Sequence, residues 1–196
     1  MKALCSLLVV WMAGTLPVAV SWADEVLAPR EAAEGPVSLS AQGEVQEATT
    51  TLVVASWNVE NLFDTEDDPN NEGDDAYTPN GWVRWTPARY RLKLQHLAEV
   101  IAHMKPDVLC MTEIENRRVL EDLSGVLLSR HAYALPVIVH RDSPDKRGID
   151  VAVLARHVPV ATNWLATTGG QREVLACEFN VGGRSLTVLV NHWKSQ

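Results

Sequence analysis

Polar side chains follow the first strand-like run of the chain, at the point where that run should end. Residues 52–55 (LVVA) form a short apolar stretch typical of a strand that is buried on both faces. Asn58 and Glu60 come next, and side chains two residues apart in an extended chain point the same way. An amide can hydrogen-bond a phosphate oxygen, and a carboxylate can hold a hard cation such as Mg²⁺. Taken alone, these two residues fit the end of an ordinary strand at least as well.

A second strand-like run ends in a carboxylate in the same way. Residues 107–111 (DVLCM) read as a strand, and Glu113 follows them. The segment from Thr86, a favourable N-cap, to Pro106 predicts a helix with apolar residues at helical spacing. Since such a helix connects neighbouring parallel strands, Glu60 and Glu113 are expected side by side at one sheet edge. Further predicted elements are a helix over residues 117–130 and strands over residues 135–140 and 150–155.

A predicted hairpin leads to a third polar group. Two apolar-rich strands, residues 173–181 and 185–191, are joined by a Gly-Gly turn. The second strand runs into the sequence NHWKS, which places Lys194 and Ser195 just after His192. This combination suits phosphate binding or proton transfer, whereas a lone His at a strand end usually closes that strand at the surface.

The segment after the first strand is strongly acidic. Residues 65–82 contain Pro, Gly and Asn at positions that favour a loop, together with six carboxylates: Glu66, Asp67, Asp68, Glu72, Asp74 and Asp75. The spacing imitates the first half of a calcium-binding EF-hand loop, but Pro79 stands where a bidentate Glu is required. A solvated acidic loop is therefore expected.

The first fifty residues are expected to lie outside the folded domain. Residues 1–23 combine a basic start, an apolar run and the sequence SWA, which predicts a signal peptide cleaved before Asp24 and a secreted or periplasmic protein. The apolar run is too short to span a membrane, so no stable membrane association is expected. Residues 24–50 are rich in Ala, Glu, Gln, Ser and Pro and predict a flexible linker. The domain then covers residues 51–196.

Charge and cysteine content limit the choice of partners and cross-links. The formal net charge is −8, so the chain has no long-range attraction for DNA. Cys5 would leave with the signal peptide, and Cys110 and Cys177 both lie in apolar strand-like runs. Two buried free thiols are favoured over a disulfide.

Four motifs that end or begin strands occur in a characteristic order: SWNVENLFD, PDVLCMTEIEN, RGIDVAVL and NHWKS. Together they resemble the endonuclease/exonuclease/phosphatase superfamily, over residues 51–196. The resemblance implies an α/β fold of the deoxyribonuclease-I-like type, in which a two-sheet sandwich is flanked by helices. It also implies a metal-dependent phosphoric ester hydrolase that uses Mg²⁺, with Mn²⁺ and Ca²⁺ as alternatives.

The resemblance implies roles for individual residues. Glu113 matches the principal metal-binding glutamate, and Glu60 stands where some relatives place an acidic residue that assists the metal. Asn58 matches an Asn beside the phosphate, and His192 matches a catalytic His that contacts the phosphate oxygens. For four further residues the resemblance implies only proximity to the substrate: Arg147, Asp150, Lys194 and Ser195.

The resemblance stops short at the C-terminus. The family completes its site with an Asp-x-Asn motif and an Asp-His pair, and neither follows NHWKS here. The domain is therefore expected to lack its C-terminal third, with strand 185–191 left unpaired and the chain by itself inactive. The favoured function is a nuclease that hydrolyses phosphodiester bonds. The alternatives are a phosphatase or phospholipid phosphodiesterase of the same fold, and a truncated remnant that at most binds a metal or a partner.

Overall fold

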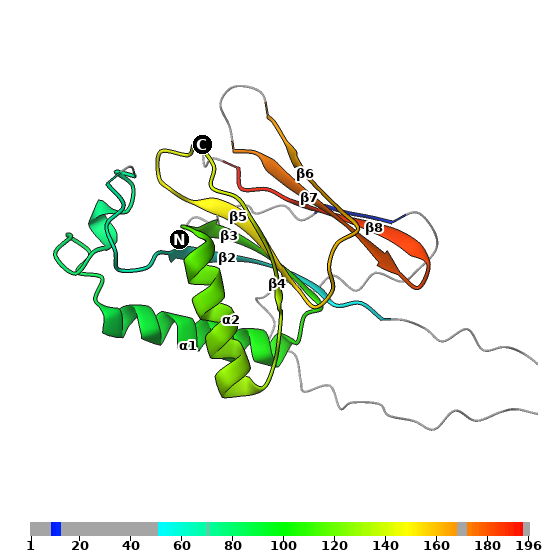
Figure 1. Ribbon diagram of the computed structural model, residues 1–196, viewed down its shortest axis with the longest axis horizontal. Helices are drawn as coiled ribbons and strands as arrows, with labels where there is room; N and C mark the ends of the chain where they lie inside the picture. Colours follow the sequence, from blue (N-terminus) through cyan, green and yellow to red (C-terminus); the bar gives the residue numbers. More distant parts are fainter. Residues whose placement is uncertain (1–8, 13–50, 70, 168–171, 194–196) are drawn as a thin grey trace, which may run out of the picture.

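The protein is a sandwich of two β-sheets with two helices on one outer face. The computed structural model describes residues 9–12, 51–69, 71–167 and 172–193. Figure 1 shows α1 and α2 together on one side of the sheet that contains β2 and β3, with the β6-β7-β8 strands on the other side. The elements are β1 (Val9–Met12), β2 (Val54–Leu62), a 3₁₀ turn (Asp75–Tyr77), α1 (Pro87–Met104), β3 (Val108–Ile114), α2 (Arg117–His131), β4 (Val137–His140), β5 (Asp150–Ala155), β6 (Ala161–Leu165), β7 (Val174–Val181) and β8 (Arg184–Val190). The expected two-sheet α/β fold is confirmed.

The sheet that carries the polar strand ends has the order β2-β3-β5-β4. β2 and β3 are parallel neighbours, with Asn58 opposite Thr112, and α1 makes the crossover between them. β5 pairs antiparallel with both β3 and β4. The ends of β2 and β3 therefore meet at one edge, as the crossover argument predicted. The start of β5 lies at the same edge.

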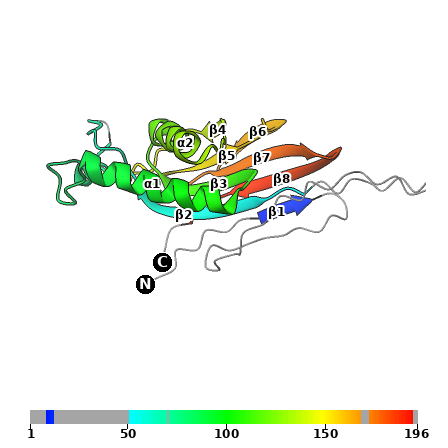
Figure 2. The same ribbon diagram turned by 90° about the horizontal axis from the view of Figure 1, so that it is seen from below.

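This sheet has a separate apolar core on each face, which explains its continuous apolar strands. On β3, Leu109 and Met111 pack with α1 and α2, whereas Val108 and Cys110 pack with the second sheet. The alternation follows from the two-residue period of a strand. Figure 2, the same molecule seen from below, shows α1 along β2 and β3.

Both helices begin after a capping side chain, of which Thr86 was predicted. The Thr86 side chain accepts a hydrogen bond from Arg89 N–H before α1, and the Asn116 side chain accepts one from Val119 N–H before α2. α1 ends at a left-handed Lys105, next to Pro106, which cannot continue a helix. Among the described residues, no helix combines the length and apolar character that a membrane crossing needs.

The second sheet differs from expectation at both of its edges. Its order is β1-β8-β7-β6, and β6 has no counterpart among the predicted strands because its sequence, ATNWL, is short and mixed. At the other edge, Val9–Met12 pairs antiparallel with Leu186–Leu189 of β8. In the full chain, a segment of the predicted signal peptide therefore covers the edge that was expected to be unpaired in residues 51–196 alone, for which the expectation stays a prediction.

The two cysteines lie between the sheets as free, buried thiols, as expected. Burial raises the pKa of both thiols, to about 12 for Cys177. Both are therefore protonated at neutral pH and act as small apolar side chains in this core.

Candidate active site at the ends of β2, β3 and β8

Three non-glycine residues in the left-handed region shape the site. Glu60 (φ 54°), Asn61 (φ 61°) and Glu113 (φ 66°) are all near strand ends. The β2–β3 register shifts between Asn58 and Leu62, and the β3–β5 register shifts around Glu113. Residues other than glycine rarely adopt this backbone conformation, which costs roughly 1 kcal/mol or more per residue. Two bulges side by side therefore turn these residues out of the regular alternation of the strands.

Glu113 is the centre of the resulting cluster, and its side chain is buried. Its Oε1 accepts a hydrogen bond from Asn58 Nδ2 at 3.2 Å, and its Oε2 accepts one from the backbone N–H of Asn61 at 2.9 Å. Burial raises the pKa of this carboxyl, but the contacts with His192 and Asn58 and the charge of Arg147 outweigh it and lower the pKa to about 2. Glu113 is thus a carboxylate under all ordinary conditions.

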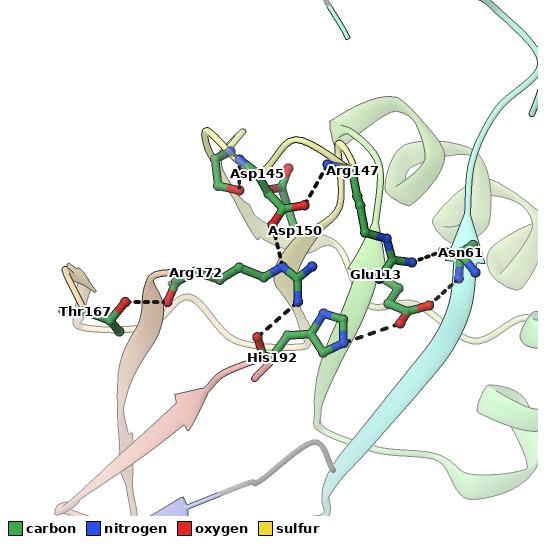
Figure 3. Close-up of polar contacts among 9 residues, drawn as sticks. Asn61, Glu113, Asp145, Arg147, Asp150, Thr167, Arg172 and His192 are labelled. Atoms are coloured by element: carbon green, nitrogen blue, oxygen red, sulfur yellow. Dashed lines mark hydrogen bonds and ion pairs between the residues drawn. The ribbon is translucent and has the colours of Figure 1, made fainter. Parts of the chain in front are cut away.

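His192 reaches the same carboxylate from the second sheet. Its Nε2 lies 3.4 Å from Glu113 Oε1, and its side chain is about 1% exposed. The contact lacks hydrogen-bond geometry, so both ring nitrogens are buried without a hydrogen-bond partner among the described residues. Such groups are rare in stable proteins and often mark the place of a ligand. Figure 3 shows His192 and Asn61 on opposite sides of Glu113.

Glu60 does not project with Asn58 as the extended-chain argument predicted. The left-handed backbone at Glu60 breaks that alternation, and the residue is exposed. Its backbone N–H donates to Asn58 Oδ1 at 2.9 Å, and its carbonyl accepts from Lys93 Nζ at 2.5 Å. Glu60 therefore shapes the site through its backbone, and no described contact brings its carboxylate to Glu113.

Two arginines approach the cluster from the side of β5 and β7. Arg147 donates to Asn61 Oδ1 at 2.9 Å. Arg172 forms a buried ion pair with Asp145 at 2.9 Å and donates to the backbone oxygen of His192 at 3.4 Å. Figure 3 shows both contacts. Arg147 is exposed and can meet an anionic substrate, whereas Arg172 positions the His192 backbone.

Asp150 lies in the first position of β5, beside the cluster but outside its hydrogen bonds. Its Oδ1 accepts from Ser143 N–H at 3.0 Å, and its Oδ2 lies 3.3 Å from His140 Nε2. The structure thus brings Asn58 and His192 into contact with Glu113, and no described contact joins Asp150 to these three residues. Lys194 and Ser195 lie outside the described residues.

Sequence reasoning missed three residues that hold the cluster in place. Lys93 of α1 donates to the carbonyls of Glu60 and Asn61, at 2.5 and 3.2 Å. Asn61 bridges Glu113 and Arg147, and Arg172 holds the His192 backbone. Asn61 carried a usable signal, because Asn tolerates the left-handed conformation better than most residues. Lys93 and Arg172 carried none, since their roles depend on tertiary contacts.

The chemistry of the cluster fits a hard divalent cation. Mg²⁺ commonly uses one or two carboxylates and keeps several waters, and Glu113 supplies one carboxylate that remains ionised. Each of its oxygens accepts one described hydrogen bond, and a carboxylate oxygen has a second lone pair for a metal. Glu113 would hold the ion, and the buried imidazole of His192 lies 3.4 Å from the same carboxylate.

Comparison with known proteins supports the same interpretation. A comparison with curated proteins found no match. A family model described as the endonuclease/exonuclease/phosphatase family matches residues 53–196, which include β2, the two helices and β8 as well as Asn58, Glu113 and His192. On this match and on the two-sheet fold, the chain belongs to the endonuclease/exonuclease/phosphatase family.

Proposed function

We propose that the protein is an exported, divalent-metal-dependent phosphoesterase that acts on the phosphodiester bonds of nucleic acid. The main support is that three groups meet at one place: the ionised carboxylate of Glu113, the side-chain amide of Asn58 and the buried imidazole of His192, which has no hydrogen-bond partner among the described residues. Family membership supports hydrolase chemistry in general. The choice of nucleic acid follows the sequence resemblance, which favours a nuclease among the phosphoesterases of this family.

The residues divide the chemistry among them. In-line attack on a phosphate ester places negative charge on the phosphoryl oxygens and on the leaving oxygen, and a bound divalent cation neutralises part of that charge. Glu113 would hold the cation, and His192 would donate a ring N–H to a phosphoryl oxygen. Asn58 keeps Glu113 oriented through the 3.2 Å hydrogen bond. Arg147 provides a fixed positive charge beside the strand ends, which offsets the net charge of −8 for an anionic substrate.

The test measures metal binding and hydrolysis separately. Mg²⁺ binding is followed by calorimetry, and cleavage is followed on a plasmid, a phosphomonoester and a phospholipid. Mg²⁺-dependent cleavage of the plasmid alone supports a nuclease. Preferential cleavage of the phosphomonoester would indicate a phosphatase instead, and preferential cleavage of the phospholipid would indicate a phospholipid phosphodiesterase. Metal binding without any cleavage supports a non-catalytic remnant.

Export is tested on the protein recovered from outside the cytoplasm. The intact mass is expected to correspond to a chain that begins at Asp24. A membrane-bound product that retains Met1 would contradict the proposed export.

A further inference from the structure

Three potential metal ligands lie around the loop that joins β4 to β5. His140 is the last residue of β4, Asp142 follows in the loop, and Asp150 is the first residue of β5. One ligand atom from each of the three lies within 4.8 Å of the other two. Since β4 and β5 are antiparallel neighbours, the sheet itself brings both ends of residues 141–149 together.

Two members of the group are buried, and one is short of polar partners. The side chains of His140 and Asp150 are 2% and 4% exposed. His140 Nε2 lies 3.3 Å from Asp150 Oδ2, yet it has no hydrogen-bond partner among the described residues. A buried nitrogen of this kind destabilises the folded state unless a partner is supplied. The other oxygen of Asp150 accepts from Ser143 N–H at 3.0 Å, which fixes the carboxylate.

The donor set differs from that of the Glu113 cluster. One imidazole nitrogen and two carboxylate oxygens suit Zn²⁺ and related transition metals, with water as a fourth ligand. Ligand atoms in a tetrahedral zinc site lie roughly 3.4 Å apart, which the His140–Asp150 contact already matches. Asp142 is 84% exposed, and one of its oxygens lies within 4.8 Å of the ligand atoms that His140 and Asp150 offer, so rotation of its side chain brings it within range.

We propose that His140, Asp142 and Asp150 form a second metal site that binds Zn²⁺ or a similar transition-metal ion. Asp150 pairs with Ile114 of β3, next to Glu113, but no described contact joins Glu113 to His140, Asp142 or Asp150. This donor set is therefore distinct from the one that Glu113 would supply.

Such an ion would close the loop of residues 141–149 at its base. Within this loop, Asp145 holds Arg172 and Arg147 reaches Asn61. Ordering a loop in advance lowers the entropy cost of placing its side chains. If the proposed phosphoesterase function holds, the second ion also fixes the substrate-facing Arg147.

The test uses Co²⁺ as a spectroscopic probe with the full 196-residue chain. Four-coordinate Co²⁺ with a nitrogen ligand absorbs visible light much more strongly than octahedral Co²⁺ bound to oxygen and water. About one equivalent should produce this absorption, and Zn²⁺ should displace it. The absorption should persist in Glu113→Gln, which separates the two sites whether or not the protein hydrolyses phosphate esters.

Three further variants test whether Co²⁺ binds at this group of residues. His140→Gln should abolish the absorption, and Asp142→Ala should weaken Co²⁺ binding at least about tenfold, because even outer contacts of metal sites are worth that much. Asp142 is exposed, so its variant remains informative if His140→Gln does not fold. His157→Ala removes an exposed histidine elsewhere and should have no effect. An absent absorption in the original chain, or an unchanged one in Asp142→Ala, overturns the second site.

Discussion

Glu113 combines a strained backbone with a side chain that several contacts hold in place. Its backbone lies in the left-handed region, which by itself disfavours the native state. Contacts from β2 and from His192 fix the carboxylate in return. Glu115, two residues later, has an ordinary role, since its Oε2 accepts from the Asp64 N–H at 2.7 Å and so ties β2 to β3. The neighbouring glutamates therefore provide a matched pair for mutation.

Glu113→Gln should weaken Mg²⁺ binding and lower any metal-dependent hydrolysis by at least about a hundredfold, because a charged ligand becomes a neutral amide. The measurements are a calorimetric Mg²⁺ titration and a cleavage assay. Glu115→Gln, which retains an oxygen for the Asp64 N–H, should leave Mg²⁺ affinity unchanged. An equal loss of Mg²⁺ affinity in both variants would contradict the assignment of Glu113 as the metal ligand.

The buried thiols give a second prediction at this scale. Thiolates, not thiols, react with alkylating agents, and burial holds the pKa of Cys177 at about 12 and raises that of Cys110. In a Cys5→Ser chain at pH 8, iodoacetamide should therefore modify neither cysteine in the native state and both in denaturant. Rapid labelling of the native protein, measured by mass, would show that the core between the sheets opens.

At the scale of elements, the bulges of β2 and β3 depend on α1. Lys93 lies on that helix and donates to the carbonyls of Glu60 and Asn61, the two left-handed residues of β2. Burial lowers the pKa of Lys93, and the charges of Glu60 and Glu113 oppose that effect. A helix that packs on the sheet thus also stabilises an irregular strand end.

Lys93→Met should lower the free energy of unfolding by about 1 kcal/mol, the usual cost of lost hydrogen bonds. It should also weaken Mg²⁺ binding, because Asn61 N–H would no longer be held toward Glu113. Thermal unfolding and calorimetry measure the two effects. Arg91→Met, on the exposed face of α1, is the control. An Mg²⁺ affinity equal to that of the original chain would show that the bulge is maintained without Lys93.

Sequence patterns predicted the regular elements better than the irregular ones. Apolar periodicity and capping residues located α1, α2 and β5 to within a residue or two, since burial and capping are local signals. The left-handed backbone at Glu60 and Asn61 leaves no periodic pattern of apolar residues, so the sequence did not reveal it. Extended geometry was therefore assumed at Glu60, and its side chain was placed beside Asn58. Motif order identified Glu113, Asn58 and His192, but not Lys93 or Arg172, whose contacts arise only in the folded chain.

For the whole molecule, the decisive feature is that the outer strand of the second sheet, β1, comes from the far N-terminus. The β1–β8 pairing satisfies backbone groups along Leu186–Leu189 that would otherwise be free to pair with another chain. This part of β8 is apolar apart from Thr187. The stability of the second sheet is thereby linked to the fate of residues 1–23.

A chain of residues 24–196 lacks β1 and should associate or aggregate more than the full chain, because apolar uncharged strand edges pair readily. Light scattering after size exclusion measures this. Adding Thr187→Lys to the short chain should reduce association, since a charge on an edge strand opposes pairing. A monomeric, soluble short chain would show that β1 is dispensable.

The pairing of β1 with β8 competes with export of the N-terminal segment. Val9–Met12 is made at the start of synthesis, and its partner segment in β8 is made near the end of the sequence. Contacts between segments so distant in sequence form late in folding. If export machinery captures the N-terminal segment during synthesis, the pairing with β8 has no opportunity to form. One gene product would then divide into two populations, an exported one with an open sheet edge and a retained one in which its own leader closes that edge.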